Sequence, residues 1–235
     1  MLELHNVSVR FGGLTAVNDV TLKIASNDVI GLVGSNGAGK TTLFNAISGL
    51  VQPTAGSIRF GGRDILHAPM YQRARMGIGR TFQVPQPMHE LTVRENLLVA
   101  QRFGTGRIDH KRLDEILDFT SLSAKADRDA ASELALTELK ALEVAKALAT
   151  DPQLLLLDEV LAGLETTGKR RFMGMLRELH TQFNVGIVMI EHDIETISSL
   201  CPRVAVLNFG QLIADGAPAA VFRDPAVIQS YTGAA

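Results

Sequence analysis

The 235-residue sequence contains one cysteine, Cys201, so no disulfide can form within the chain. A single cysteine fits a reducing compartment, where disulfide frameworks do not persist. Long apolar runs are also missing, because those at 154–157 and 185–190 are strand-sized and fall short of the ~20 residues that span a bilayer. Residues 1–11 alternate like a strand and lack the charged-then-apolar plan of a signal peptide. These absences predict a soluble intracellular protein that could still dock onto a membrane protein.

Charge of one sign is not in excess either, since 23 Lys and Arg stand against 25 Asp and Glu, for a net charge of −2. Nucleic-acid-binding domains usually carry a basic excess, so we predict no nucleic-acid partner. No internal repeat or low-complexity tract is evident. The length allows one large domain, or a domain with a substantial insert.

Secondary-structure patterns change twice along the chain. Short β-rich segments come first, at about 2–9, 18–25, 28–33 and 57–60. Helical spacing dominates from about 92 to 149, and apolar strands then alternate with helices again. This alternation predicts an α/β fold with a parallel sheet covered on both faces. We therefore predict an α/β core at 1–87 and 151–235 with an N-terminal antiparallel β subdomain, and a helical subdomain at 88–150.

A glycine-rich motif, GSNGAGKTT, stands between an apolar strand and a helical segment. It matches G-x-x-x-x-G-K-[ST], in which the glycines let backbone N–H groups point at phosphate oxygens. Lys40 can reach the β and γ phosphates, and Thr41 can ligate Mg²⁺. A glycine-rich turn can match by accident, but the strand before it and the helix after it favour a nucleotide site. The predicted contacts in this loop are Gly34, Ser35, Asn36, Gly37, Ala38, Gly39, Lys40, Thr41 and Thr42.

Two acids follow the apolar run LLLL, at the carboxyl end of a predicted buried strand. Ligands bind at that end of the strands in open α/β sheets. Asp158 suits the shell of a Mg²⁺ ion, and Glu159 suits the polarisation of an attacking water. The alternative, a strand that ends in two solvated acids, is disfavoured by the phosphate loop.

With these motifs placed, the chain resembles the ATP-binding subunit of an ABC transporter over nearly its full length. The family has a P-loop NTPase core and binds ATP and Mg²⁺. GIGRTFQ resembles its glutamine loop, so that Gln83 would contact Mg²⁺ and water. IEHD resembles its switch region, so that His192 would contact the γ-phosphate. The resemblance thus implies Glu159, His192, Gln83 and Lys40 as catalytic residues, and Thr41, Gln83 and Asp158 as Mg²⁺ ligands.

Further segments extend the resemblance. Phe11, in RFGG, stands at the position of the aromatic residue that stacks on adenine, and Val17 is a further implied nucleotide contact. LAGLE resembles the loop that crosses the dimer interface, with Glu165 where Asp is usual. RTFQ, LTVRENLLVA and the closing GQLIADGAPAAVFRDPAVIQSYTG are similar to the branched-chain amino-acid importer branch. That branch implies permease subunits, a second and different ATPase chain, a substrate-binding protein reached indirectly, and a place on the inner face of the cell membrane.

One family motif, Leu-Ser-Gly-Gly-Gln, is replaced here by LALTE, Leu134–Glu138. In the family this segment begins a helix that faces the γ-phosphate bound on the opposite subunit of a head-to-tail dimer. Here Ala135 replaces the serine, both glycine positions carry side chains, and Glu138 replaces the glutamine. A carboxylate there would repel phosphate. We therefore expect a heterodimer with one competent site and one weakened site.

The start of this helix is also poorly marked. Thr137 could cap it, but Lys140 stands where a capping box wants Glu or Gln. Glu138 would suit the box only if the cap were Ala135, which has no side-chain acceptor. Upstream, the segment Val84–Leu91 is expected to line the groove that receives a cytoplasmic helix of the permease, or else to pack between domains.

Two other functions stay open. A lipopolysaccharide-type exporter ATPase shares a similar ARMGIG neighbourhood, although RTFQ favours the importer. A regulatory, non-transport nucleotide-binding protein would explain the degraded signature, although Glu159 and His192 argue against a purely structural role. The transported substrate cannot be read from this chain, because selectivity belongs to the permease and the external binding protein.

Overall fold

Residues 1–232 are described by a computed structural model of the chain, which divides into two compact units. The first unit comprises Met1–Arg73 and Gly186–Ala235, and the second comprises Ala74–Val185. Across residues 1–232, no helix has both the length and the apolar character needed to cross a membrane.

An antiparallel sheet opens the first unit, with the strand order β2-β1-β4-β5. Its strands are β1 (Leu2–Phe11), β2 (Leu14–Ile24), β4 (Ala55–Phe60) and β5 (Arg63–Asp64). The alternation in the N-terminal segment buries Leu2 and Leu4 on one face, opposite Ile24 and Leu22 of β2. The predicted antiparallel β subdomain is therefore confirmed.

Mostly parallel strands form the other sheet segment of the first unit. In spatial order they are β10 (Gln211–Gly216), β9 (Arg203–Asn208), β3 (Val29–Val33) and β8 (Gly186–Ile190). Strand β3 pairs in parallel with both β8 and β9, and β10 is antiparallel to β9. The helices of this unit are α1 (Lys40–Ser48), α7 (Ile194–Leu200), α8 (Pro218–Val221) and α9 (Pro225–Thr232). Because carboxyl ends of parallel strands share an edge, the loops after β3 and β8 lie at the same edge.

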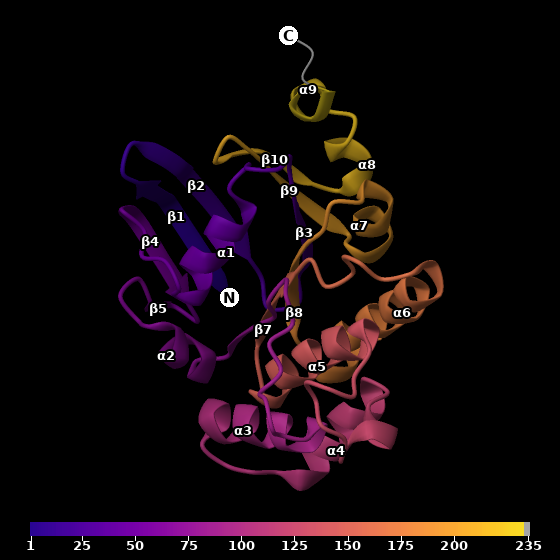
Figure 1. Cartoon of the computed structure of the whole chain (residues 1–235). Helices are drawn as coiled ribbons and strands as arrows, with labels where there is room; N and C mark the ends of the chain where they lie inside the picture. The colour runs from indigo at the N-terminus through magenta and orange to yellow at the C-terminus, as the bar shows by residue number, and fades with distance from the viewer. Residues whose placement is uncertain (233–235) are drawn as a thin grey trace. The chain divides into compact units, whose positions relative to one another are not determined.

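The second unit is mainly helical. Its helices are α3 (Val93–Thr105), α4 (His110–Phe119), the short 3₁₀ helix η1 (Ser123–Lys125), α5 (Leu136–Ala149) and α6 (Thr166–Phe183), and α2 (Met70–Arg75) contains the boundary between the units. The parallel strands β6 (Ile78–Arg80) and β7 (Leu154–Asp158) also belong to it. Helix α5 packs against α3 and α4 (Figure 1). The predicted functional division, with a helical subdomain at 88–150, stays a prediction.

Candidate functional site

The glycine-rich loop between β3 and α1 has a backbone that only glycine fits at two positions. Gly34 and Gly39 have φ values of 148° and 100°, in the region that side chains disfavour. A Cβ atom on Gly34 would lie 2.1 Å from the carbonyl oxygen of Leu207, and one on Gly39 would lie 2.3 Å from that of Ala16. The shape of the loop is thus set by close backbone contacts with β9 and β2.

The start of α1 suits an anion. Gly39 is its N-cap, and among the described residues no side chain caps the helix there. The first N–H groups of a helix lack intrahelical partners and carry partial positive charge, so they attract phosphate. Lys40 folds across the loop, donating from Nζ to the carbonyl oxygens of Gly34 at 2.7 Å and Ser35 at 3.1 Å. These features fit the predicted phosphate cradle.

Other predicted nucleotide contacts also belong to the first unit. His192 follows β8, and therefore lies at the same sheet edge as the loop after β3. Phe11 ends β1 with its side chain 51% exposed, which leaves a ring face for stacking. Val17 lies in β2 with its side chain fully buried. The roles of these residues stay predictions.

In the second unit, Asp158 ends β7 beside a residue that the sequence analysis missed. The guanidinium of Arg80 donates from Nη2 to Asp158 Oδ2 at 3.2 Å, and the two side chains are 5% and 4% exposed. Burial raises the pKa of Asp158, and the charge and hydrogen bond of Arg80 oppose that rise. The backbone N–H of Asp158 also donates to Thr81 Oγ1 at 3.1 Å. An arginine within the glutamine-loop segment gives no local signal of this pairing.

Glu159 and Gln83, which the family resemblance implies as catalytic residues, are in direct contact. Gln83 Nε2 donates to Glu159 Oε2 at 2.5 Å. Glu159 has a φ of 49°, a left-handed conformation that is uncommon for a non-glycine residue and is concentrated at functional sites. The backbone at the end of β7 thus turns sharply where the predicted general base stands.

The predicted Mg²⁺ ligands offer only oxygen atoms, from the hydroxyl of Thr41, the amide of Gln83 and the carboxylate of Asp158. Oxygen donors are what Mg²⁺ prefers, usually as one or two carboxylates together with substrate phosphates. Within residues 1–232 there is no group of three or more His, Cys, Asp or Glu that could hold a metal by itself. The donor set therefore fits Mg²⁺ held jointly with a nucleotide.

The start of α5 is capped in an unexpected way. Ala135 is the N-cap residue, with extended φ and ψ of −72° and 163°, and it offers no side-chain acceptor. Glu138 Oε2 accepts hydrogen bonds from the Ala135 N–H and from Lys125 Nζ, both at 2.8 Å. Burial tends to raise the pKa of Glu138, but these hydrogen bonds and the charge of Lys125 outweigh it, so the pKa is lowered. Half of a capping box is thus present.

This geometry changes the interpretation of LALTE. Glu138 is turned back onto its own helix and paired with Lys125, so its charge is partly compensated. The side chains that differ most from the family pattern are then Ala135, which lacks a hydroxyl, and Leu136, which is 44% exposed. Leu136 also lies close to Gly163 in the LAGLE loop, since a Cβ atom added to Gly163 would be 3.3 Å from Leu136 Cδ2.

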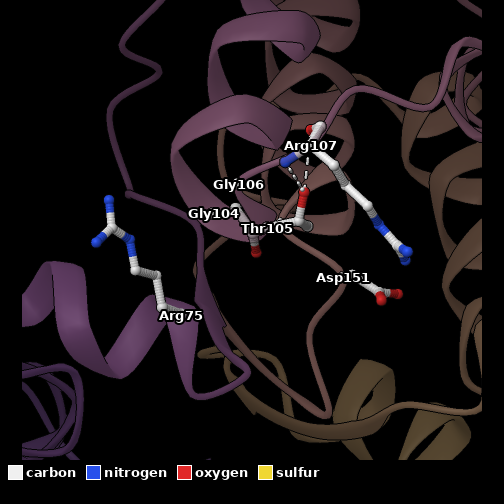
Figure 2. Close-up of a pocket in the computed structure, with 7 residues that line it drawn as sticks. Arg75, Gly104, Thr105, Gly106, Arg107 and Asp151 are labelled. Atoms are coloured by element: carbon white, nitrogen blue, oxygen red, sulfur yellow. Dashed lines mark hydrogen bonds between the residues drawn. The ribbon is translucent and has the colours of Figure 1, made fainter.

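Figure 2 shows a separate hollow in the second unit, at the C-terminal ends of α3 and α5. Its lining residues are Arg75, Gly104, Thr105, Gly106, Arg107, Thr150 and Asp151. Thr105 Oγ1 bonds to the backbone of Arg107 there. No residue predicted as a nucleotide or Mg²⁺ contact lines this hollow.

Known proteins match the chain over nearly its whole length. The ABC transporter family matches residues 17–162. The chain belongs to this family. A second family, the branched-chain amino acid ATP-binding cassette transporter, matches residues 211–235, of which 233–235 lie outside the described residues.

Relatives of this ABC protein include two named as high-affinity branched-chain amino acid transport ATP-binding proteins. BraF of Pseudomonas aeruginosa is 36% identical, with 100% of this chain and 98% of the relative covered. LivG of Escherichia coli is 37% identical with the same coverage. A lipopolysaccharide export system ATP-binding protein, LptB of Acidithiobacillus ferridurans, is 32% identical and covers 99% of this chain and 97% of its own length.

Solved structures agree with this membership. An ATP-binding cassette of an ABC transporter in its ADP conformation has a TM-score of 0.88 at 30% identity, covering 100% of this chain and 99% of its own. The nucleotide-free form of a cassette gives a TM-score of 0.87 at 29% identity, covering 100% of this chain and 99% of that one. The predicted family, the P-loop ABC fold class and the ATP-hydrolase class are thereby confirmed.

Proposed function

We propose that this chain is the ATP-hydrolysing, energy-coupling subunit of an importer for branched-chain or similar amino acids. The contact between Gln83 and Glu159 carries the hydrolytic part of the proposal, because it joins the glutamine loop to the predicted general base. The substrate class is supported by the full-length similarity to BraF and LivG and by the match of the C-terminal segment.

Each predicted residue has a role in the cleavage of ATP to ADP and phosphate. Lys40 and the N–H groups of the phosphate loop bind the phosphates, and Phe11 stacks on adenine. Glu159 accepts a proton as water attacks the γ-phosphorus, while Gln83 and His192 orient that water and the γ-phosphate.

Thr41, Gln83 and Asp158 are the residues that would hold Mg²⁺. When bound with the nucleotide, Mg²⁺ neutralises charge on the β and γ phosphates. The buried ion pair with Arg80 holds the carboxylate of Asp158 in one orientation.

The partners follow from the family and the relatives. We propose that the chain binds permease subunits at the inner face of the cell membrane and works indirectly with a substrate-binding protein. The segment Val84–Leu91 would receive a cytoplasmic helix of the permease. Pro85 and Pro87 restrict its backbone, and Met88 offers an adaptable apolar contact.

We further propose that the functional dimer pairs this chain with a different ATPase chain. The support is the start of α5, where Ala135 lacks the serine hydroxyl and Leu136 and Thr137 carry side chains at the glycine positions. A partner with an intact signature would complete the site built on this chain's phosphate loop, whereas LALTE would weaken the other site.

Two experiments test these proposals. Glu159→Gln should retain ATP binding, measured with a fluorescent ATP analogue, but lose turnover, measured by phosphate release. Unchanged hydrolysis would remove Glu159 from its assigned role. The purified wild-type chain should hydrolyse ATP slowly by itself, and cooperative hydrolysis at the rate of an intact transporter would refute the heterodimer.

The similarity to LptB supports a second candidate function, the ATPase of a lipopolysaccharide-type exporter. Stimulation of the assembled transporter by an amino-acid-loaded binding protein supports the importer, whereas stimulation by lipopolysaccharide supports the exporter. Failure to co-purify with any permease would instead favour a regulatory, non-transport protein.

A further inference from the structure

Three charged side chains lie along one side of α5, in the turns that follow the signature segment. Lys140, Glu143 and Lys146 are spaced by three residues, which places them on neighbouring positions of the helix surface. Lys140 and Glu143 are each only 3% exposed, although such residues are almost never buried without partners. We call these three residues the α5 latch.

Lys140 holds the backbone of both members of the hydrolytic pair. Its Nζ donates to the carbonyl oxygen of Gln83 at 2.6 Å and to that of Glu159 at 3.0 Å. The side chains of the same two residues bond each other at 2.5 Å. One ammonium group therefore fixes both backbones at the point where the side chains meet. It also helps to hold Glu159 in its left-handed conformation.

The other two residues of the latch hold the segment Val84–Leu91, which follows the glutamine loop. Glu143 Oε1 accepts from the Gln86 N–H at 2.8 Å, and Lys146 Nζ donates to the Gln86 carbonyl oxygen at 2.6 Å. Lys146 and Glu143 also form an ion pair at 2.6 Å. Both backbone polar groups of Gln86 are thus bound to α5. Prolines at 85 and 87 stiffen the backbone on either side.

The packing of α5 links Lys140 to the start of the helix. Lys140 lies within one turn of Thr137, and α5 is buried over most of its length. A displacement at the signature segment must therefore move Lys140, because helices in packed cores shift as units. Lys140 would pass that movement directly to Gln83 and Glu159.

We propose that Lys140 is a positioning residue for ATP hydrolysis, which keeps the Gln83–Glu159 pair in register with the start of α5. This inference rests on the proposed function, since it takes Glu159 as the general base. The α5 latch then does more than stabilise the fold, because Gln83 and Glu159 are correctly placed only when α5 is correctly placed.

The test compares two substitutions in the full chain. Each variant is produced together with the permease subunits and is assayed in the assembled transporter. Lys140→Met keeps the aliphatic stem but removes the donors, and Lys140→Arg restores donors and charge. We expect Lys140→Met to lower kcat by about tenfold to a hundredfold, since misplacement by ~1 Å has effects of that size. The KM for ATP should stay within about twofold, because the phosphate loop is untouched. Lys140→Arg should recover most of the lost kcat.

Hydrogen exchange gives a readout that does not depend on turnover. In Lys140→Met, the amides of Gln83, Val84, Gln86, Met88 and Glu159 should exchange faster, while those of α3 stay as protected as in wild type. Thr120→Val is the matched control: Thr120 is 5% exposed in the same unit, and its hydroxyl bonds the Ile116 carbonyl of α4 at 2.8 Å rather than the backbone of the glutamine loop or of Glu159. It should lower stability and leave kcat unchanged.

Several results would overturn the inference. They are an unchanged kcat in Lys140→Met, a rise in KM alone, no recovery in Lys140→Arg, or an equal loss of kcat in Thr120→Val. The variant Glu159→Gln distinguishes a failure of the Lys140 inference from a failure of the proposed function. If Glu159→Gln abolishes turnover while Lys140→Met leaves kcat unchanged, only the role of Lys140 is refuted. If Glu159→Gln turns over normally, the assignment of the base is refuted.

Discussion

Replacing Ala135 by serine should complete a helix cap that is half built in this chain. The residue already has the extended backbone of an N-cap, and its N–H already receives the Glu138 carboxylate at 2.8 Å. A serine hydroxyl at this place would accept from the N–H of Glu138, the third helical residue, and thereby close the reciprocal capping box. Ala135 is exposed, so the added oxygen displaces no core atom.

The size of the effect follows from capping energetics. Exchanging alanine for serine at an N-cap changes stability by roughly 0.5–2 kcal/mol, typically about 1 kcal/mol. For a chain of this length, a gain of about 1 kcal/mol corresponds to a rise in Tm of roughly 2–4 °C. The back-bond from Glu138 is already in place, so no compensating loss is expected from that residue.

Urea unfolding followed by circular dichroism measures this gain as a higher midpoint at an unchanged slope. Leu136→Ser is the matched control, because it adds the same hydroxyl one residue later, at the first helical position, where it cannot cap. Equal midpoints for wild type and Ala135→Ser, or an equal gain in Leu136→Ser, would refute the reasoning. If the missing hydroxyl also limits the chain's own dimer, Ala135→Ser should raise its intrinsic ATP hydrolysis.

Two further outcomes concern titrating groups. Glu138→Gln keeps an acceptor for the Ala135 N–H but loses the charge facing Lys125; with these side chains 31% and 38% exposed, we expect a loss below about 1 kcal/mol near neutral pH. The pKa of Glu138 is lowered in the folded state, so the loss of stability in Glu138→Gln is fully present above the pKa of the unfolded chain, about 4.3. This loss vanishes as the pH falls through the folded pKa. A difference in urea unfolding that does not change with pH would contradict the prediction. Burial, and then the charge of Glu191, raise the pKa of the Cys201 thiol to about 12, so a thiol reagent should label it only after unfolding; rapid labelling of the native protein would contradict this.

Much of the fold could be predicted from the sequence because its signals are local. The phosphate loop follows from the spacing of Gly34, Gly39 and Lys40, and the alternation near the N-terminus gives the antiparallel sheet. The pairing of Gln83 with Glu159 could also be anticipated, but only through the resemblance to a family, since 76 positions separate the two residues along the chain.

What sequence reasoning missed are buried charges with distant partners. Arg73 is 1% exposed and donates to the carbonyl oxygens of Ala46 and Ile47, in the last turn of α1. Arg80 is likewise buried and pairs with Asp158, which lies far from it along the chain. A charged residue in a short segment is ordinarily solvated, so nothing local marks these contacts. Only Lys140, Glu143 and Lys146 left a trace, as charges repeated every three residues in the part of α5 that is otherwise apolar after Glu138.

The contacts that shape the phosphate loop have a consequence for the order of events during synthesis. Gly34 is shaped against the carbonyl oxygen of Leu207, which leaves the ribosome far later than the loop itself. At roughly 5–20 residues per second, that interval is on the order of ten to thirty seconds. Throughout this time the nascent chain carries the whole motif but lacks the strand that gives it form. We therefore expect growing chains to gain affinity for ATP only after β9 has emerged.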